Sequence, residues 1–233
     1  MLRLAHSYRS PVVACSRGIA PRVRSDARGW ELLRSGDLGL LLWLSEQCAA
    51  RTDQVEALTG CSERTVQRTL ARLRSQELIH VRRILADEPA WVTPTARGLR
   101  ACGSPFGVWK PRLDLIRHVA AVNDVRIHVQ QRDHTAEWVC ERQLAKDRAG
   151  QAEHLPDAIV LTEGRRVAIE VELSVKSRRR IEAIITELVA RHDAVLYYCT
   201  PASERVIRAL ADGGRWPALA IRELPVPQRA WTW

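Results

Sequence analysis

The chain lacks most of the features that mark a membrane, secreted or zinc-scaffold protein. No apolar run approaches the roughly 18 residues of a membrane span, and LGLLLWL (residues 38–44) is short enough to be a core helix. The six cysteines are scattered, with no CxxC pair and no cysteine–histidine cluster at metal spacing, which favours reduced thiols. We therefore expect a cytoplasmic protein with no membrane partner, and 233 residues are enough for two modest domains.

Acidic residues are nearly absent from the start of the chain. Residues 1–28 hold six arginines and one aspartate, a charge of +5, whereas residues 29–106 carry +1 and residues 107–233 carry +3 of the total +9. Prolines and glycines break this first segment, so we expect a disordered basic arm that contacts phosphates without reading sequence. An organelle transit peptide has a similar composition and stays open as an alternative. In the rest of the chain, any nucleic-acid contact must come from local clusters rather than from a bulk positive field.

Three helices are expected in a row after the arm. The first is expected to begin at Asp37 and the second at Thr52, each as an N-cap, because short polar side chains accept hydrogen bonds from the first turn. Gly60 is a typical stop for the second helix, since glycine adopts the left-handed conformation that ends helices. The third spans residues 62–77, with a core stripe formed by Val66, Leu70 and Leu73. This order is that of a helix-turn-helix.

Two short strands follow the third helix, LIHVRRILA and AWVTPT, and ARGLRACG closes the unit as a short helix. A two-stranded wing in this place resembles the winged-helix family, from about Trp30 to Gly103. The resemblance implies a winged helix-turn-helix DNA-binding domain at residues 29–106, whose third helix enters the major groove. The side chains expected to contact DNA are Ser62, Arg64, Thr65, Gln67, Arg68, Arg72, Arg82 and Arg83. A solvated arginine face and a protein-docking module are the alternatives.

The second half of the chain begins after a Gly/Pro-rich junction at residues 103–110. A helix is expected from Pro111 onward, although residues 125–129 also alternate like a strand. EGRR (residues 163–166) fits a tight hairpin turn. The segments expected after the first helix are strands at 135–144, 154–161, 165–174, 194–200 and 218–225, and helices at 178–192 and 203–214. Residues 226–233 form a Trp-containing tail suited to docking on another surface.

HLPDAIVLTEGRRVAIEVELSVKS (residues 154–177) places one aspartate and two glutamates on paired strands. Pro156–Asp157 and Glu170, with twelve residues between the two acids, resemble the motif of the PD-(D/E)xK nuclease-like fold. The chain from about Gly36 to Pro201 is similar to plasmid replication-relaxation proteins. The implied fold class is α+β or α/β: a winged helix-turn-helix domain, then a restriction-endonuclease-like αβββαβ domain at residues 107–225.

Two carboxylates side by side on a strand pair suit a hard divalent ion. Asp157 and Glu170 are the expected metal ligands, with Glu141 on the preceding strand as a further acid, and oxygen donors of this kind favour Mg²⁺ or Mn²⁺. The ion would polarise a scissile phosphate and activate water. Glu172 occupies the slot where the resemblance implies a lysine. Either Glu172 acts as the general base, or Lys176 reaches back into the site, or the site is inactive and the fold serves binding.

Each of these acids also has a plainer interpretation. Asp157 after a proline is typical of a turn cap. On a solvent-exposed face, Glu170 and Glu172 would pair with residues 178–180, which are all arginine. His118 and His154 are expected to be structural or solvated rather than ligands.

These patterns predict double-stranded DNA as the partner. One hypothesis is a DNA-binding protein of a plasmid or mobile element that cleaves or nicks DNA with Mg²⁺. The other is a non-catalytic replication or transfer accessory factor, or a transcriptional repressor, with a degenerate nuclease fold. A protein-interaction module is a third hypothesis. A homodimer and other replication or transfer proteins are open as further partners.

Overall fold

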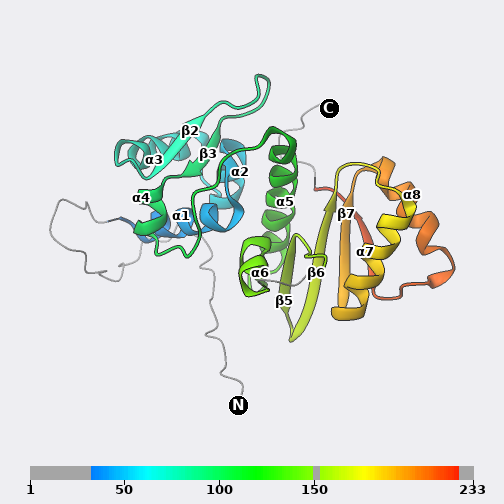
Figure 1. The fold of residues 1–233 in the computed structure, drawn as a ribbon. Helices are drawn as coiled ribbons and strands as arrows, with labels where there is room; N and C mark the ends of the chain where they lie inside the picture. The colour runs from blue at the N-terminus through cyan, green and yellow to red at the C-terminus, as the bar shows by residue number, and fades with distance from the viewer. Residues whose placement is uncertain (1–32, 149–152, 226–233) are drawn as a thin grey trace, which may run out of the picture.

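The computed structural model describes residues 33–148 and 153–225, which form a mixed α/β protein with eight α-helices and two sheets (Figure 1). The expectations for the basic arm at residues 1–28 and the tail at residues 226–233 lie outside the described residues. A helical group with the small sheet lies on one side of helix α5, and the larger sheet lies on the other (Figure 1).

The N-terminal group contains the three expected helices and a small antiparallel sheet. Its central strand β3 (Trp91–Pro94) pairs with β2 (Ile79–Arg82) and with a two-residue strand, β1 (Ala50–Arg51), that was not foreseen. The helices are α1 (Ser35–Gln47), α2 (Thr52–Thr59), α3 (Glu63–Ser75) and α4 (Ala96–Ala101). The predicted stripe of α3 is buried among the leucines of α1. Hydrophobic periodicity alone therefore located α3 within two residues at each end.

The expected helix caps are partly wrong. Asp37 does not begin α1; it lies in the first turn, where its carboxylate accepts a hydrogen bond from the backbone N–H of the N-cap Arg34 (3.1 Å). Thr52 is likewise the first helical residue after the N-cap Arg51. Acids are also favourable inside the first turn because of the helix dipole, so they do not fix the first residue. Gly60 ends α2 with φ +63°, as predicted.

The larger sheet has the strand order β4-β5-β6-β7-β8. The first three strands are antiparallel, and β7 and β8 run parallel to β6. Their bounds are β4 (Glu137–Cys140), β5 (Ala158–Thr162), β6 (Arg165–Glu172), β7 (Ala194–Cys199) and β8 (Leu219–Glu223). The apolar run at 194–200 is an interior parallel strand, as its composition predicted.

A two-residue turn joins β5 and β6. Thr162 pairs with Arg165, which leaves Glu163 and Gly164 as the loop, with φ values of +48° and +73°. Positive φ at both central residues is the type I′ geometry, whose twist matches the flanking strands. This turn fixes the register that sets the acids of the two strands side by side.

Helices cover both faces of the larger sheet (Figure 1). On one face lies α5 (Leu113–Arg132), which packs Ala121, Val122 and Val125 against the strands. On the other face lie α7 (Arg178–Arg191) and α8 (Pro201–Ala211). The buried residues of α7 are the predicted Ile181, Ile184, Ile185 and Leu188.

One alternative in this half is decided, and one expectation is wrong. Residues 125–129 belong to α5, which begins two residues after Pro111. The expected strand at 135–144 is two elements, since β4 ends at Cys140 and α6 (Glu141–Asp147) follows directly. Glu141 therefore begins a helix and does not end a strand. Alternating apolar residues in EWVC and the helical i, i+3 spacing in ERQL cannot be separated over so few residues.

Helix α5 is shared by the two halves. Ile127 joins the core of the N-terminal group, and Ile116 packs with Trp91, whereas Val125 joins the core of the larger sheet. A buried ion pair crosses the junction: Arg126 Nη2 lies 2.6 Å from Glu46 Oε2. The Arg126 guanidinium also stacks on one tryptophan from each half, 5.1 Å from the ring centre of Trp43 and 5.8 Å from that of Trp138.

Candidate functional site

The outer face of α3 is polar and exposed. Ser62 is the N-cap, and its hydroxyl lies 3.0 Å from the hydroxyl of Thr65. Arg64 and Arg68 are exposed, and neither forms an ion pair with another described residue. Two adjacent turns of the helix therefore present guanidinium groups whose five donors each are available to an outside acceptor.

The other arginines expected to contact DNA differ in whether their guanidinium groups already have partners within the protein. Arg72 donates two hydrogen bonds to the buried carboxylate of Asp37, at 2.7 and 2.8 Å, and so ties α3 to α1. This geometry gives Arg72 a structural role inside the protein. Arg82 on β2 is exposed, and Arg83 is exposed beside it while donating to the carbonyl of Ala86 (2.8 Å).

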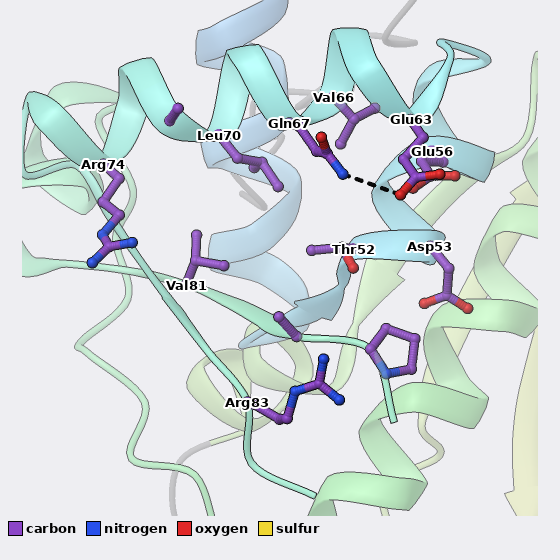
Figure 2. A pocket seen from close by; sticks show the side chains of 13 residues that line it. Thr52, Asp53, Glu56, Glu63, Val66, Gln67, Leu70, Arg74, Val81 and Arg83 are labelled. Atoms are coloured by element: carbon purple, nitrogen blue, oxygen red, sulfur yellow. Dashed lines mark hydrogen bonds between the residues drawn. The ribbon is translucent and has the colours of Figure 1, made fainter. Parts of the chain in front are cut away.

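A groove of about 570 Å³ separates α3 from the β2–β3 hairpin (Figure 2). Gln67 lies over it and donates to Glu63 Oε1 at 3.0 Å. The charged residues of the groove divide by sign: Asp53, Glu56 and Glu63 at one end, Arg74 and Arg83 away from them (Figure 2). A phosphate group would be repelled at the acidic end, so only the arginine end of the groove suits a nucleic-acid backbone.

Sheet register brings the predicted acids together. Ala158 is opposite Ile169, so the preceding Asp157 lies beside Glu170 at the end of the strand pair. The backbone N–H of Val171 donates to Asp157 Oδ2 at 2.7 Å, which holds this carboxylate against β6. The two acids therefore meet where β6 ends and β5 begins.

Each of these two acids has a histidine partner. His118 Nε2 of α5 lies 2.7 Å from Asp157 Oδ1, and His154 Nε2 lies 3.1 Å from Glu170 Oε2. The hydrogen bond to Glu170 raises the pKa of His154. Burial is the largest influence on His118 and opposes its protonation, but the hydrogen bond to Asp157 and the nearby charges of Asp157, Glu170 and Glu141 together raise its pKa. The histidines were expected to be structural or solvated rather than ligands, and their contacts with the two acids were not foreseen.

Glu170 and Glu172 are both buried, with 3% of each residue exposed. Burial raises the pKa of Glu170 to about 7, and the nearby charge of Asp157 adds to the increase. Glu172 contacts Lys176, with Nζ 2.6 Å from Oε2. Lys176 thus reaches back to the strand end, and neither acid pairs with residues 178–180.

Glu141 faces a small pocket of about 50 Å³ together with Asp157 and His118. Loss of solvent around the carboxyl group, together with the Asp157 charge, raises the pKa of Glu141. The end of α1 lines the same pocket through Glu46, Gln47 and Cys48. Gln47 Nε2 is buried and has no hydrogen-bond partner among the described residues. No sequence motif connects residue 47 to the acids, because their meeting depends on how the halves pack.

The donor set suits a hard divalent ion that takes few protein ligands. Among the described residues, no group of three or more His, Cys, Asp and Glu side chains is placed to hold a metal ion. Asp157 and Glu170 nevertheless offer carboxylate oxygens at one place, and a cation would offset the cost of burying Glu170. Mg²⁺ binds through one or two carboxylates with waters and substrate phosphates as its other ligands.

No protein-family model, curated protein or solved structure matches the chain. None of the helices in the described part is long and apolar enough to cross a membrane. The cysteines in that part, at positions 48, 61, 102, 140 and 199, are not joined in disulfides.

Proposed function

We propose that the chain binds double-stranded DNA through a winged-helix unit at residues 29–106 and cleaves or nicks it with a PD-(D/E)xK nuclease-like unit at residues 107–225. The observation that carries this proposal is the meeting of Asp157 and Glu170 on neighbouring strands, with Glu170 buried. A carboxylate is expensive to bury, and a cation-binding role gives a reason for its place at the sheet end.

The DNA-binding part of the proposal rests on α3 and the hairpin. Arg64 and Arg68 are exposed and lack an acidic partner in the described structure, and Arg82 is exposed on the hairpin. Arginine can form two hydrogen bonds to guanine in the major groove, and this groove is wide enough to admit an α-helix. The chain would be at work in the cytoplasm, in the replication or transfer of a plasmid or mobile element.

In the cleaving form, Asp157 and Glu170 would hold Mg²⁺ or Mn²⁺, and Glu141 lies near Asp157 in the same pocket. The ion, when bound, supplies a Lewis acid for the phosphate and a more acidic water. Lys176 lies where it can steady negative charge, since its ammonium group already contacts Glu172. His118 holds the Asp157 carboxylate in position through the 2.7 Å contact.

A second candidate is a DNA-binding accessory factor or repressor whose nuclease-like site is inactive. The observation that favours it is that each acid already has a basic partner in the protein: His118 for Asp157, His154 for Glu170 and Lys176 for Glu172. In this form the basic side chains take the place of the ion.

Incubation of the full chain with supercoiled plasmid and Mg²⁺ or Mn²⁺ separates the two candidates. Cleavage is expected for the wild type, and Asp157→Asn or Glu170→Gln should lower it by at least about 100-fold, since the ion loses a charged ligand. The same variants should lose thermal stabilisation by Mn²⁺ while keeping duplex affinity. Asp147→Asn, at an exposed position of α6, is the matched control. Persistent cleavage in the Asp157→Asn variant, or a wild type that only binds, would reject the nuclease function.

A further inference from the structure

Three consecutive arginines begin α7 and have no acidic partner among the described residues. Arg178, Arg179 and Arg180 are all exposed. The acids they were expected to neutralise, Glu170 and Glu172, contact His154 and Lys176 instead. Mutual pairing with the buried acids therefore does not account for these arginines.

Their position is electrostatically unfavourable for the helix itself. The N-terminus of an α-helix carries a partial positive charge, which favours acids and disfavours cations in the first turn. The first turn of α7 has no acid, and its N-cap Ser177 accepts a hydrogen bond from the backbone N–H of Arg180. Arginines and helix dipole thus repel one another, and both attract an anion.

This first turn lies beside the carboxylate site. The chain passes from Glu172 at the end of β6 to Arg178 through a five-residue connection. Ser174 and Lys176 of that connection both contact the Glu172 carboxylate. α7 also packs on the sheet face to which Ala168 and Tyr197 belong.

We propose that Arg178, Arg179 and Arg180 form a second DNA contact, which binds backbone phosphates next to the carboxylates. The inference rests on the proposed function, because it takes DNA as the ligand. The contact reads no sequence, since arginines on a phosphate backbone position the duplex without touching base edges. α3 lies on the other side of α5, so the two contacts engage different parts of one duplex (Figure 1).

The test is the salt dependence of duplex binding by the full chain. Fluorescence anisotropy measures the binding, in the absence of divalent ions. Substitution of all three arginines by glutamine should make the slope of log affinity against log salt shallower by about 2–3, because each lost phosphate contact removes about 0.9. Substitution by lysine should keep the slope, because it keeps the charge. The glutamine variant should melt, without DNA, at the same temperature as the wild type or higher.

The matched control removes three exposed arginines at the opposite end of the sheet: Arg132, Arg165 and Arg166. Its slope should match that of the wild type. Parallel slopes for the wild type and the α7 variant, or an equal loss of slope in the control, would overturn the inference and leave the nuclease proposal standing. A shallower slope in the α7 variant alone supports it, even if the plasmid is never cleaved. A wild type without duplex affinity overturns both.

Discussion

Acidic side chains are neutralised differently at the junction of the two halves and at the end of the larger sheet. At the junction, Glu46 is held by Arg126, and within the N-terminal group Asp37 is held by Arg72. At the sheet end, Asp157 and Glu170 are held by histidines. An arginine stays charged at any pH that the protein meets, whereas a histidine gains and loses its proton near neutrality.

The difference separates permanent contacts from exchangeable ones. Arginine partners fix the relative placement of helices, and removing one leaves a buried charge without compensation. Histidine partners can give up a carboxylate to a divalent ion at a smaller cost, since neutral imidazole carries no charge. The arginine-held acids therefore suit a permanent architectural role, and the histidine-held acids suit exchange of one partner for another.

The largest expected effect comes from breaking the junction. Arg126→Met should lower the free energy of unfolding by about 3–5 kcal/mol, because the buried Glu46 loses its ion pair with Arg126. Urea denaturation of both proteins measures this loss. The double variant Glu46→Gln/Arg126→Met should recover part of it. A single variant as stable as the wild type would show that the arginine-held acids are not architectural.

The arginines of α3 are expected to give smaller effects, of two kinds: some on DNA affinity and one on stability. Arg64→Ala and Arg68→Ala should each weaken duplex binding by about 1–3 kcal/mol with little change in stability, because both are exposed. Arg72→Ala should instead lower the free energy of unfolding by about 1–2 kcal/mol, since Asp37 loses the two hydrogen bonds from Arg72. Anisotropy and urea denaturation measure the two quantities. Full duplex affinity in both Arg64→Ala and Arg68→Ala would remove the DNA-reading role of α3.

Asp124 of α5 provides an intermediate case. It accepts a hydrogen bond from Gln54 (2.7 Å) and faces Arg51 at 3.5 Å, yet burial raises its pKa from 3.8 to about 6. A raised carboxyl pKa means that the folded state binds the proton more tightly, so its contribution to stability is lost as pH rises from about 4 to 6.

The wild type should therefore lose stability relative to Asp124→Asn across that range, by at most about 1.4 kcal/mol per pH unit. Unfolding in urea at pH 4, 5, 6 and 7 measures the difference. A difference that stays constant or rises with pH would show that Arg51 controls this carboxyl group after all.

Most of the secondary structure was predictable because it follows from the local periodicity of apolar residues. The α3 stripe and the β5–β6 hairpin each follow from spacing within about a dozen residues. The side-by-side placement of Asp157 and Glu170 was also predictable, since the tight turn at 163–164 dictates the register. The secondary-structure prediction was wrong where the local pattern is short, as in residues 135–144.

The partners of the acids were not predictable in the same way. His118 lies 39 residues before Asp157, and Arg126 lies 80 residues after Glu46. Their meeting depends on how α5 packs between the two halves, which no local pattern encodes. His154 is nearer, and a basic side chain in HLPD just ahead of the predicted acid was a signal that could have been used.

The stacking of Arg126 between Trp43 and Trp138 bears on how such a chain can evolve. Each half supplies one indole ring, and the N-terminal half also supplies Glu46. A recombination event that exchanged either half for an unrelated one would leave a guanidinium or a carboxylate buried at the interface of the halves without the ion pair between Arg126 and Glu46. The two halves are therefore expected to be inherited together, with residues 43, 46, 126 and 138 changing in concert.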